Sequence, residues 1–568
     1  MRKHIIVTFV CFGILAASCV ERGGEDITGR VEADAKYIGQ AVGNFSAEEW
    51  YPGGALGTTV NVTAGCYEDP TPATQQQGLM TAFNNGQASF ERNFTLNTDP
   101  FKGLGPAFVR SSCLDCHPGY GHGKRQDSYR SVNGNGYLLV VYHPVDGDNS
   151  DDGPYIAEVT GMPQTNATAP FKAPIDESLI QINWHKVSEM ESGLPMKFKD
   201  GETYELIYPD VYIPDAAFNT DPVPTNLAFR LESTIGIIGS GLLDAIPMED
   251  IREQYRSEAP YVELNPAFWD KAANDFAAGA WYGYSRLGAG NYADGSDAGA
   301  DTQLLKRFTY ACTRATLQDG PGANAIWNIT NVTRNDRPYL YTTSAWAKAM
   351  SEDPEVIAAI QADPKSPYYM DGSKEKIAEA VLALLDPATN QFDNAYHNFE
   401  PEFSDDKYYN LLVWQRGLAI PRARNLNRKD VQRGKEVFME IGCASCHRPS
   451  WNTAEDNYWE PASVGKRPMP RYANQTIYPY TDMIQHRLYM KNGIHGSWCR
   501  TTPLWGRGLS KTNTGAEDRL HDNRARNVLE SIMWHGYSSK SEAYSATEKF
   551  YNLDKADRDA VCAFIDSI

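Results

Sequence analysis

Apolar and polar positions divide the chain into a strand-rich stretch and several helical stretches. Between residues 136 and 215, short segments alternate or run apolar between turn residues, which predicts β-strands. These segments are GYLLVVYH, YIAEVTG, SLIQINWH and TYELIYPDVYIP. Helical patterning follows at residues 235–256 and appears twice within residues 352–386. The pattern predicts a mainly α protein with a β-containing insertion in its N-terminal half.

The C-terminal region predicts helices at both of its ends. Residues 429–440 (KDVQRGKEVFME) have an amphipathic pattern and lead directly to Cys443. Residues 524–568 predict a helix, a turn and a helix. The last of these segments, residues 555–568, resembles the closing helix of a cytochrome c, which packs on that protein's first helix. We therefore expect residues 555–568 to pack on residues 429–440.

The N-terminus predicts export. A short basic start precedes an apolar run at residues 5–17, which has the length of a signal sequence and is too short to span a bilayer. The run ends in Leu15-Ala16-Ala17-Ser18-Cys19, which resembles a bacterial lipobox with Cys19 as the lipidation site. An ordinary secretory signal cut nearby is the alternative. Residues 1–18 are then a signal peptide, residues 19–66 a tether and N-terminal extension, and the protein a periplasmic or cell-envelope lipoprotein.

Composition narrows the class of partner. The chain has 568 residues, with 72 Asp and Glu against 53 Lys and Arg, for a formal net charge of −19. This charge argues against partners that are themselves negative, such as nucleic acids and anionic membrane surfaces. After the N-terminal run, no stretch approaches the ~18 apolar residues of a membrane-spanning helix. Membrane contact is therefore expected only through a lipid anchor.

Two C-x-x-C-H motifs carry the clearest chemical signal. They are Cys113, Cys116 and His117 in the first, and Cys443, Cys446 and His447 in the second. This spacing is the attachment motif of c-type haem. The two thiols add across the two vinyl groups of one porphyrin, and the adjacent histidine ligates iron. A thioredoxin-like pair does not need the trailing histidine, and a zinc site needs further ligand pairs. The sequence therefore predicts two haem c groups, with His117 and His447 as axial ligands.

Two other features allow more than one interpretation. Outside the haem motifs, the mature chain has four cysteines, Cys66, Cys312, Cys499 and Cys562. In an oxidising compartment they could form two disulfides with three connectivities, or remain buried free thiols. The acidic loop at residues 146–153 has the composition of a calcium site, although solvated turns share that composition.

Several blocks of sequence resemble one family. They are GLGPAFVRSSCLDCHPGYGHG at 103–123, IGIIGSGLLDAIP at 235–247, RFTYACTRATLQDGPGANAIWNITN at 307–331, IGCASCHRP at 441–449, RTTPLWGRGL at 500–509 and LHDNRARNVLESIMWHG at 520–536. Together they resemble the di-haem oxidoreductases once called CxxC-containing thiol oxidoreductases. That family is similar to the bacterial di-haem cytochrome c peroxidases and to the di-haem enzyme of methylamine dehydrogenase maturation.

The resemblance implies a two-domain architecture and a different role for each haem. It implies two cytochrome c-like haem domains, at residues 67–400, with the strand-rich insertion, and at residues 401–568. In the relatives, the N-terminal haem reacts with peroxide and the C-terminal haem relays electrons. This chain departs from the family pattern at Asn523, where relatives read glycine in HDGRA, at His486–Met490, where they have an HDMG-like element, and at Cys499. These departures affect the substrate pocket more than the haem chemistry.

The second axial ligand decides whether an iron transfers electrons or binds a substrate. For the C-terminal haem, His535 occupies a position that resembles the axial Met or Tyr of the relatives, with Met533 as a local competitor. His521 is a further candidate, either as a ligand or as a partner of a propionate or a water. For the N-terminal haem, the candidates are His122, His143, His185 and His397. An open position there is what a peroxidase needs, and the sequence singles out no catalytic acid or base.

Two functions from different classes follow. The first is an exported di-haem c-type oxidoreductase of the peroxidase type, in which electrons enter at the C-terminal haem and hydrogen peroxide, or another small oxidant, is reduced at the N-terminal haem. The alternative is a non-catalytic di-haem electron-transfer protein, or a component that handles iron or haem at the envelope. The acidic charge favours a basic electron donor, such as a small periplasmic cytochrome c.

Overall fold

The computed structural model describes residues 34–95, 103–129, 136–144, 156–283, 303–315, 317, 326–334, 340–389, 402–456 and 467–568. The predicted signal peptide, Cys19, the acidic loop at residues 146–153 and His397 lie outside these ranges. Helices account for 36% of the structure and strands for 14%. The fold is therefore mixed, with helices outweighing strands that form only small sheets. Within the described residues, no helix has both the length and the apolar character needed to cross a bilayer.

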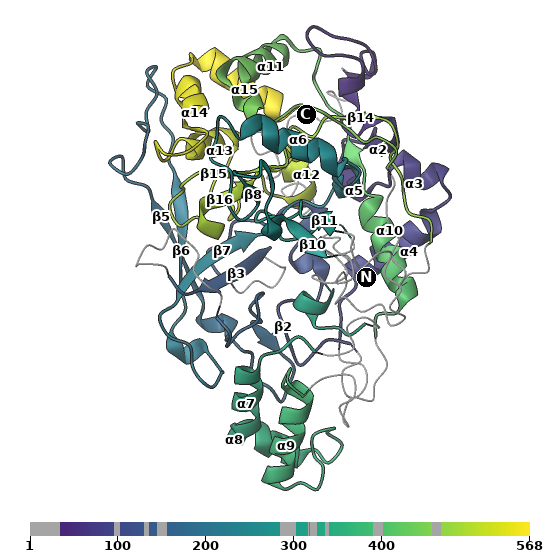
Figure 1. Ribbon diagram of the computed structural model, residues 1–568, viewed down its shortest axis with the longest axis vertical. Helices are drawn as coiled ribbons and strands as arrows, with labels where there is room; N and C mark the ends of the chain where they lie inside the picture. The colour runs from purple at the N-terminus through teal and green to yellow at the C-terminus, as the bar shows by residue number, and fades with distance from the viewer. Residues whose placement is uncertain are drawn as a thin grey trace, which may run out of the picture.

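The elements are labelled as in Figure 1. The helices are α2 (Gly54–Gly57), α3 (Pro72–Gln76), α4 (Met80–Glu91), α5 (Ser240–Asp244), α6 (Met248–Glu258), α7 (Ser344–Glu352), α8 (Pro354–Ala362), α9 (Lys374–Leu385), α10 (Asp405–Arg416), α11 (Lys429–Ile441), α12 (Ser510–Thr514), α13 (Val528–His535), α14 (Tyr544–Tyr551) and α15 (Lys555–Ile565). The strands are β1 (Thr58–Thr59), β2 (Ala107–Phe108), β3 (Tyr137–Tyr142), β4 (Asn166–Ala167), β5 (Gln181–Lys186), β6 (Ile207–Tyr212), β7 (Ala228–Ser233), β8 (Trp269–Asp270), β9 (Asp275–Phe276), β10 (Trp281–Gly283), β11 (Gln303–Leu305), β12 (Ile420–Pro421), β13 (Trp451–Asn452), β14 (Thr476–Ile477), β15 (Gln485–Arg487) and β16 (Trp498–Arg500).

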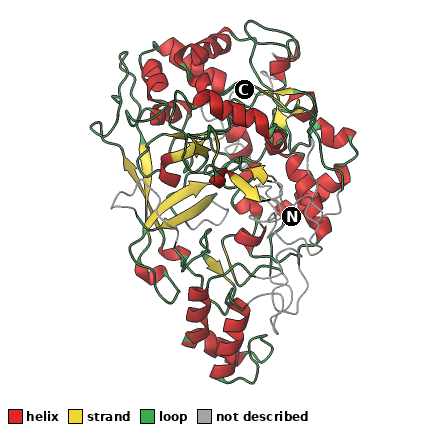
Figure 2. Cartoon of the chain, viewed as in Figure 1, coloured by secondary structure: helices red, strands yellow, loops and turns green. Residues whose placement is uncertain are grey.

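The predicted strand-rich stretch contains the longest strand pairs. β3 pairs antiparallel with β7, and β5 pairs antiparallel with β6. Three of the four predicted segments are confirmed as β3, β5 and β6. The prediction of a strand at YIAEVTG is wrong, because residues 156–161, the described part of that segment, form no strand. There the backbone is satisfied by side chains instead of a neighbouring strand, since Tyr341 accepts the Gly161 N–H at 3.0 Å. Figure 2 shows the two long pairs on one side of the molecule.

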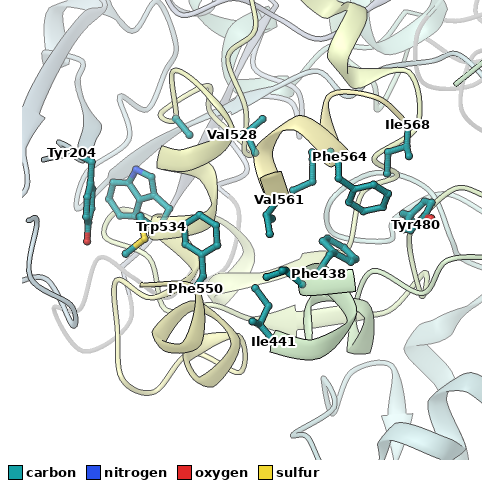
Figure 3. Packing of buried hydrophobic residues seen from close by; sticks show 14 of the residues in the cluster. Tyr204, Phe438, Ile441, Tyr480, Val528, Trp534, Phe550, Val561, Phe564 and Ile568 are labelled. Atoms are coloured by element: carbon teal, nitrogen blue, oxygen red, sulfur yellow. The ribbon is translucent and has the colours of Figure 1, made fainter. Parts of the chain in front are cut away.

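Helices α11 and α15 form the crossing expected for residues 429–440 and 555–568. The α11 face that carries Val437 and Phe438 packs against Val561 and Phe564 of α15 within one apolar cluster (Figure 3). Gly434 lies at the crossing, where a Cβ atom would clash with the carbonyl oxygen of Ala560. The two backbones approach closely because this position has no side chain. The expected packing of the last segment on the first is confirmed.

We predict that Gly434→Ala destabilises the C-terminal region. The added methyl group meets a backbone carbonyl, so the helices must separate, and overpacking of this kind costs about 1–3 kcal/mol. Chemical denaturation of the purified protein, followed by circular dichroism, would measure the loss. Glu440→Ala is the control, because Glu440 is exposed on the same helix. Equal midpoints for the two variants would show that the crossing tolerates a side chain.

Two predicted helical regions contain more elements than expected. Residues 235–256 form α5 and α6, which are separated at Pro247, the residue that immediately precedes α6. Proline has no backbone N–H and favours a helix start, so it divides the helical pattern. The tail forms three helices, α13, α14 and α15, where two were expected. Helices α7, α8 and α9 pack together on their own apolar cluster at the lower end of Figure 1.

The N- and C-terminal parts of the chain interlock. Helix α10, in the region predicted as the C-terminal domain, packs on α4 of the N-terminal part (Figure 1). Gly86 of α4 permits the contact, because a Cβ there would meet the Asn410 carbonyl. In the other direction, Phe45 and Trp50 of the N-terminal extension are buried in the cluster of α11 and α15. Each haem motif therefore lies against residues from both parts of the chain.

Candidate functional site

The second C-x-x-C-H motif begins where α11 ends. Gly442 terminates the helix in the left-handed conformation at φ 99°, which glycine adopts without strain. Cys443–Ser445 then form a single helical turn, and the His447 N–H donates to the Cys443 carbonyl at 3.0 Å. This turn gathers Cys443, Cys446 and His447 in one place. The sequence spacing thus becomes a compact group of two thiols and an imidazole.

These three residues line a cavity of about 320 Å³. His535, at the C-terminal end of α13, lines the same cavity. Both histidines are deep in the protein, yet part of each side chain remains accessible, as expected for groups that border an internal space. The volume lies within the range of cofactor pockets. The structure therefore brings His447 and His535 to one space together with the thiols that would attach a haem.

Both imidazoles are oriented by backbone carbonyls. Nδ1 of His447 lies 3.0 Å from the Tyr480 carbonyl oxygen, and Nδ1 of His535 lies 2.7 Å from the Ser531 carbonyl oxygen. A carbonyl can only accept, so each Nδ1 carries the proton and each Nε2 keeps its lone pair. Metal-bound histidines are commonly oriented in this way. Burial lowers the pKa of both rings, that of His447 to about 4, so both are neutral as ligation requires.

The other two distal candidates have different surroundings. His521 lines the cavity, with its Nε2 3.5 Å from Asp522 and 3.4 Å from the Arg524 guanidinium. Met533 is buried in the apolar cluster of α11 and α15 and is not among the described residues that line the cavity. The geometry therefore separates Met533, which packs, from His535, which faces the cavity.

A buried charged cluster lies beside Cys446. His486 bridges two carboxylates, with its Nε2 2.8 Å from Asp482 and its Nδ1 2.7 Å from Glu542. Burial lowers the pKa of His486, but Cys446 and Asp482 outweigh it and hold the pKa well above its ordinary value. Glu258 is 3.6 Å from His486, and burial raises the pKa of its carboxyl to about 7. The cavity end that holds Cys446 is therefore acidic.

The first C-x-x-C-H motif forms a similar turn. Cys113–Asp115 make one helical turn capped by Ser112, whose side chain accepts the Leu114 N–H. Burial raises the pKa of the Cys113 thiol to about 12 and that of Cys116 to about 11, and it lowers that of His117 to about 4. Within the described residues, Nδ1 of His117 has no hydrogen-bond partner. Two buried thiols and a neutral, incompletely satisfied imidazole are the donor set that a haem would complete.

Aromatic side chains support the His117 ring. Phe90 of α4 lies 6.1 Å from that ring, between ring centroids, and Trp414 of α10 lies 4.2 Å from Phe90. The α4–α10 pair therefore forms a wall for the first motif. Trp414 lies almost 300 residues after His117 in the sequence, which explains why sequence patterns alone do not reveal its support.

Two glycines that follow the first motif allow a close contact with α12. Gly119 and Gly121 pack against this helix, where Cβ atoms would clash with the Asn513 carbonyl and the Thr514 methyl group. Gly119 also has a positive φ of 57°. These two glycines therefore join the first motif to the C-terminal part of the chain.

The candidates for a second ligand at the first motif lie in different places. His122 is enclosed and lines the large cavity. Its Nε2 lies 3.2 Å from the Gly236 N–H and accepts from it, so that nitrogen is engaged. His143 is half-buried and contacts the Asn226 carbonyl, and His185 is exposed beside Tyr208. The structure thus brings only His122, of these described candidates, to a cavity.

One family model matches the chain. Residues 389–568 are similar to the family described as "Di-haem oxidoreductase, putative peroxidase". The match confirms the resemblance to the di-haem oxidoreductases. It covers less than half of the chain but includes the second motif, His535 and most of the residues that line their cavity. A search of curated proteins found no match. The name of the matched family implies haem as its cofactor, and the residues at both motifs fit that group.

Of the four remaining cysteines, Cys66, Cys312 and Cys562 are free thiols in the structure. Cys66 and Cys312 are buried, and Cys499 and Cys562 are half-buried. Cys66 contacts the Asn513 side chain, whereas Cys499 lies on β16 and lines the large cavity.

Sequence reasoning missed several residues that shape the site. The carbonyls of Tyr480 and Ser531 orient the two histidines, and Arg507 and Arg519 line the large cavity. A signal was available only for Ser531, which precedes His535 by one helical turn. The others come from loops whose course depends on tertiary packing. The residues of each motif are therefore close together in the sequence, whereas the residues that support them are not.

Proposed function

We propose that the protein is an exported di-haem c-type oxidoreductase of the peroxidase type. The observation that carries the proposal is the cavity that Cys443, Cys446, His447 and His535 share. Bound there, a haem would supply one-electron redox chemistry. A histidine is available on each of two different elements, so both axial positions can be filled. Such a site is suited to passing electrons and leaves substrate chemistry to the first motif.

The first motif has the features of the reactive site. His117 is the only histidine of that motif, and the enclosed candidate nearby, His122, has its Nε2 engaged with Gly236. This arrangement supports an open position for a small oxidant. Reduction of hydrogen peroxide takes two electrons and two protons and gives two water molecules. The chain's part is to hold the group, shield it from bulk solvent and deliver protons.

A small external protein would supply the electrons. The chain's net charge of −19 favours a basic donor, such as a small cytochrome c, because complementary charge speeds the encounter. Export fits this proposal, because c-type haem is attached outside the cytoplasm. The predicted lipid anchor at Cys19 would hold the protein at the envelope beside such donors.

We predict one high-spin and one low-spin haem in the resting ferric protein. An open position at His117 gives a high-spin iron, and two histidines give a low-spin iron at His447. Optical and EPR spectra should show both, and cyanide or peroxide should remove the high-spin signal. Two low-spin haems in both redox states, together with no peroxide turnover, would contradict the proposal and favour a non-catalytic electron-transfer protein.

A further inference from the structure

A wall of the large cavity is shared with a smaller one. The smaller cavity has a volume of about 50 Å³ and is lined by Tyr67, Trp505 and residues that follow the first motif. Both cavities are lined by His122, Arg500, Thr502, Pro503 and Arg507. The wall therefore lies between the second haem site and the segment that carries the first.

Two arginines that line the large cavity, Arg507 at this wall and Arg519 outside it, are buried without a full set of partners. Arg507 is 9% exposed and Arg519 is 7% exposed. One Arg507 nitrogen donates to the Asp518 carbonyl at 2.8 Å, but Nη1 is buried and has no partner within the described residues. Arg519 pairs with Asp566 at 3.1 Å, while its Nε is likewise buried and unpartnered there. Two N–H donors are therefore left unsatisfied.

The two guanidinium groups also repel each other. Burial and the charge of Arg519 together lower the pKa of Arg507 to about 10. Since this value is well above 7, the group is still charged at neutral pH. A buried charge whose N–H groups are only partly satisfied is unfavourable. The arrangement is therefore expected to bind an anion from the cavity side. Planar guanidinium groups bind carboxylates especially well.

Negative and positive side chains line different parts of the large cavity, and this distribution suits a haem. The Cys446 thiol, an Asp482 carboxylate oxygen and a His486 ring nitrogen all lie within 4.8 Å of one another. Arg507 and Arg519 have other neighbours, because Arg507 donates to the Asp518 carbonyl and Arg519 pairs with Asp566. The thiol end therefore carries the carboxylates, and the two arginines lie at other parts of the cavity lining. In a porphyrin joined to cysteines through its vinyl groups, the two propionates project from the opposite edge. An acidic thiol end and a cationic wall match that pattern.

We propose that Arg507 and Arg519 bind the propionate carboxylates of the haem attached at Cys443 and Cys446. The inference deepens the proposed function, since it requires that haem but not the peroxidase reaction. Nη1 of Arg507 and Nε of Arg519 are the donors. The two positive charges would offset the propionates and favour the reduced state of the nearby iron. His122, on the same wall, places this contact beside the segment of the first motif.

The test uses the full-length holoprotein and its Arg507→Gln and Arg519→Gln variants. Losing a positive charge favours ferric iron, so we expect the midpoint potential of one haem to shift downward and to become pH-dependent near neutrality, where an unpaired propionate titrates. The resonance Raman propionate bands should shift as well. Arg507→Lys keeps the positive charge, so its midpoint potential should stay close to that of the wild type. Its propionate bands should still shift, because lysine lacks the planar guanidinium group. Arg526→Gln is the matched control, since Arg526 pairs with Glu530 and is not among the described cavity residues.

Three results would overturn the inference. The first is two unchanged midpoints and unchanged propionate bands in the glutamine variants, with both haems attached. The second is a wild-type midpoint that changes with added chloride or phosphate, since that would mean that a free anion occupies the wall. The third is an equal shift in Arg526→Gln. If a glutamine variant does not fold, the Raman bands of Arg507→Lys decide. Peroxide turnover is not measured, so a failure of the peroxidase proposal would leave these readouts intact.

Discussion

The double substitution Cys443→Ala/Cys446→Ala is expected to halve the covalent haem content, from two haems per chain to one. The two thiols share one turn after α11 and line the cavity with His447, so their removal deletes both attachment points at that site alone. The first motif, on its own turn against α4 and α10, keeps its thiols. Haem staining after denaturing electrophoresis, with a haem-to-protein ratio from absorbance, would measure the change.

Cys562→Ala is the matched control for the loss of a thiol. Cys562 lies on α15 in the same region but is not among the described residues that line the cavity. We expect it to keep both haems. Retention of two covalent haems by the double variant would refute the assignment of the second motif. Cys113→Ala/Cys116→Ala is the reciprocal variant and should lose the other haem.

The sequence predicts best the features that depend on neighbours along the chain. The helix at Lys429–Ile441, its end at Gly442 and the closing helix at Lys555–Ile565 follow from periodicity and local conformation. Strands β3, β5 and β6 follow from alternation. The same reasoning failed at residues 155–161, because the Gly161 N–H is bound by the Tyr341 hydroxyl across the fold. Local pattern cannot reveal such a distant partner.

The candidate site shows the same division. The thiols and histidines of the two motifs are readable because the chemistry requires a fixed spacing, and His535 was singled out by resemblance. The sequence did not reveal four other features of the site, because each reaches it through tertiary packing. They are the Tyr480 carbonyl, Arg507, Arg519 and the contact of α10 with the first motif. Both motifs are therefore supported by segments from distant parts of the chain, so the geometry of each motif depends on the whole fold.

The contact between α12 and the first motif extends this dependence. Gly119 and Gly121 pack on Asn513 and Thr514, and α12 follows Arg507 by only a few residues. The wall shared by the two cavities and the turn after the first motif are therefore mechanically joined. An electron passing between two haems is sensitive to their separation and orientation. A fold that joins the first motif to the cavity wall through one short helix would keep that geometry constant.

The substitution His535→Ala is expected to convert the C-terminal haem from low spin to high spin. His535 lines the same cavity as His447 but comes from a different element, α13. Its Nδ1 is hydrogen-bonded to the Ser531 carbonyl at 2.7 Å, which leaves the lone pair of Nε2 for the iron. Without this ring, one axial position is left to water or remains open. Peroxide turnover with an external donor should fall at least tenfold, which corresponds to about 1.4 kcal/mol of activation free energy.

Met533→Leu separates ligation from packing on the same helix. Met533 is buried in the apolar cluster, so a leucine of similar volume should cost little stability and leave the spectrum unchanged. His521→Ala tests the other histidine of the cavity, which we expect to alter the potential without changing the spin state. An unchanged spectrum in His535→Ala, or a low-spin signal lost in Met533→Leu, would remove His535 as the second ligand. The carbonyl-held ring would then be a structural histidine, and the C-terminal iron would be available to substrate.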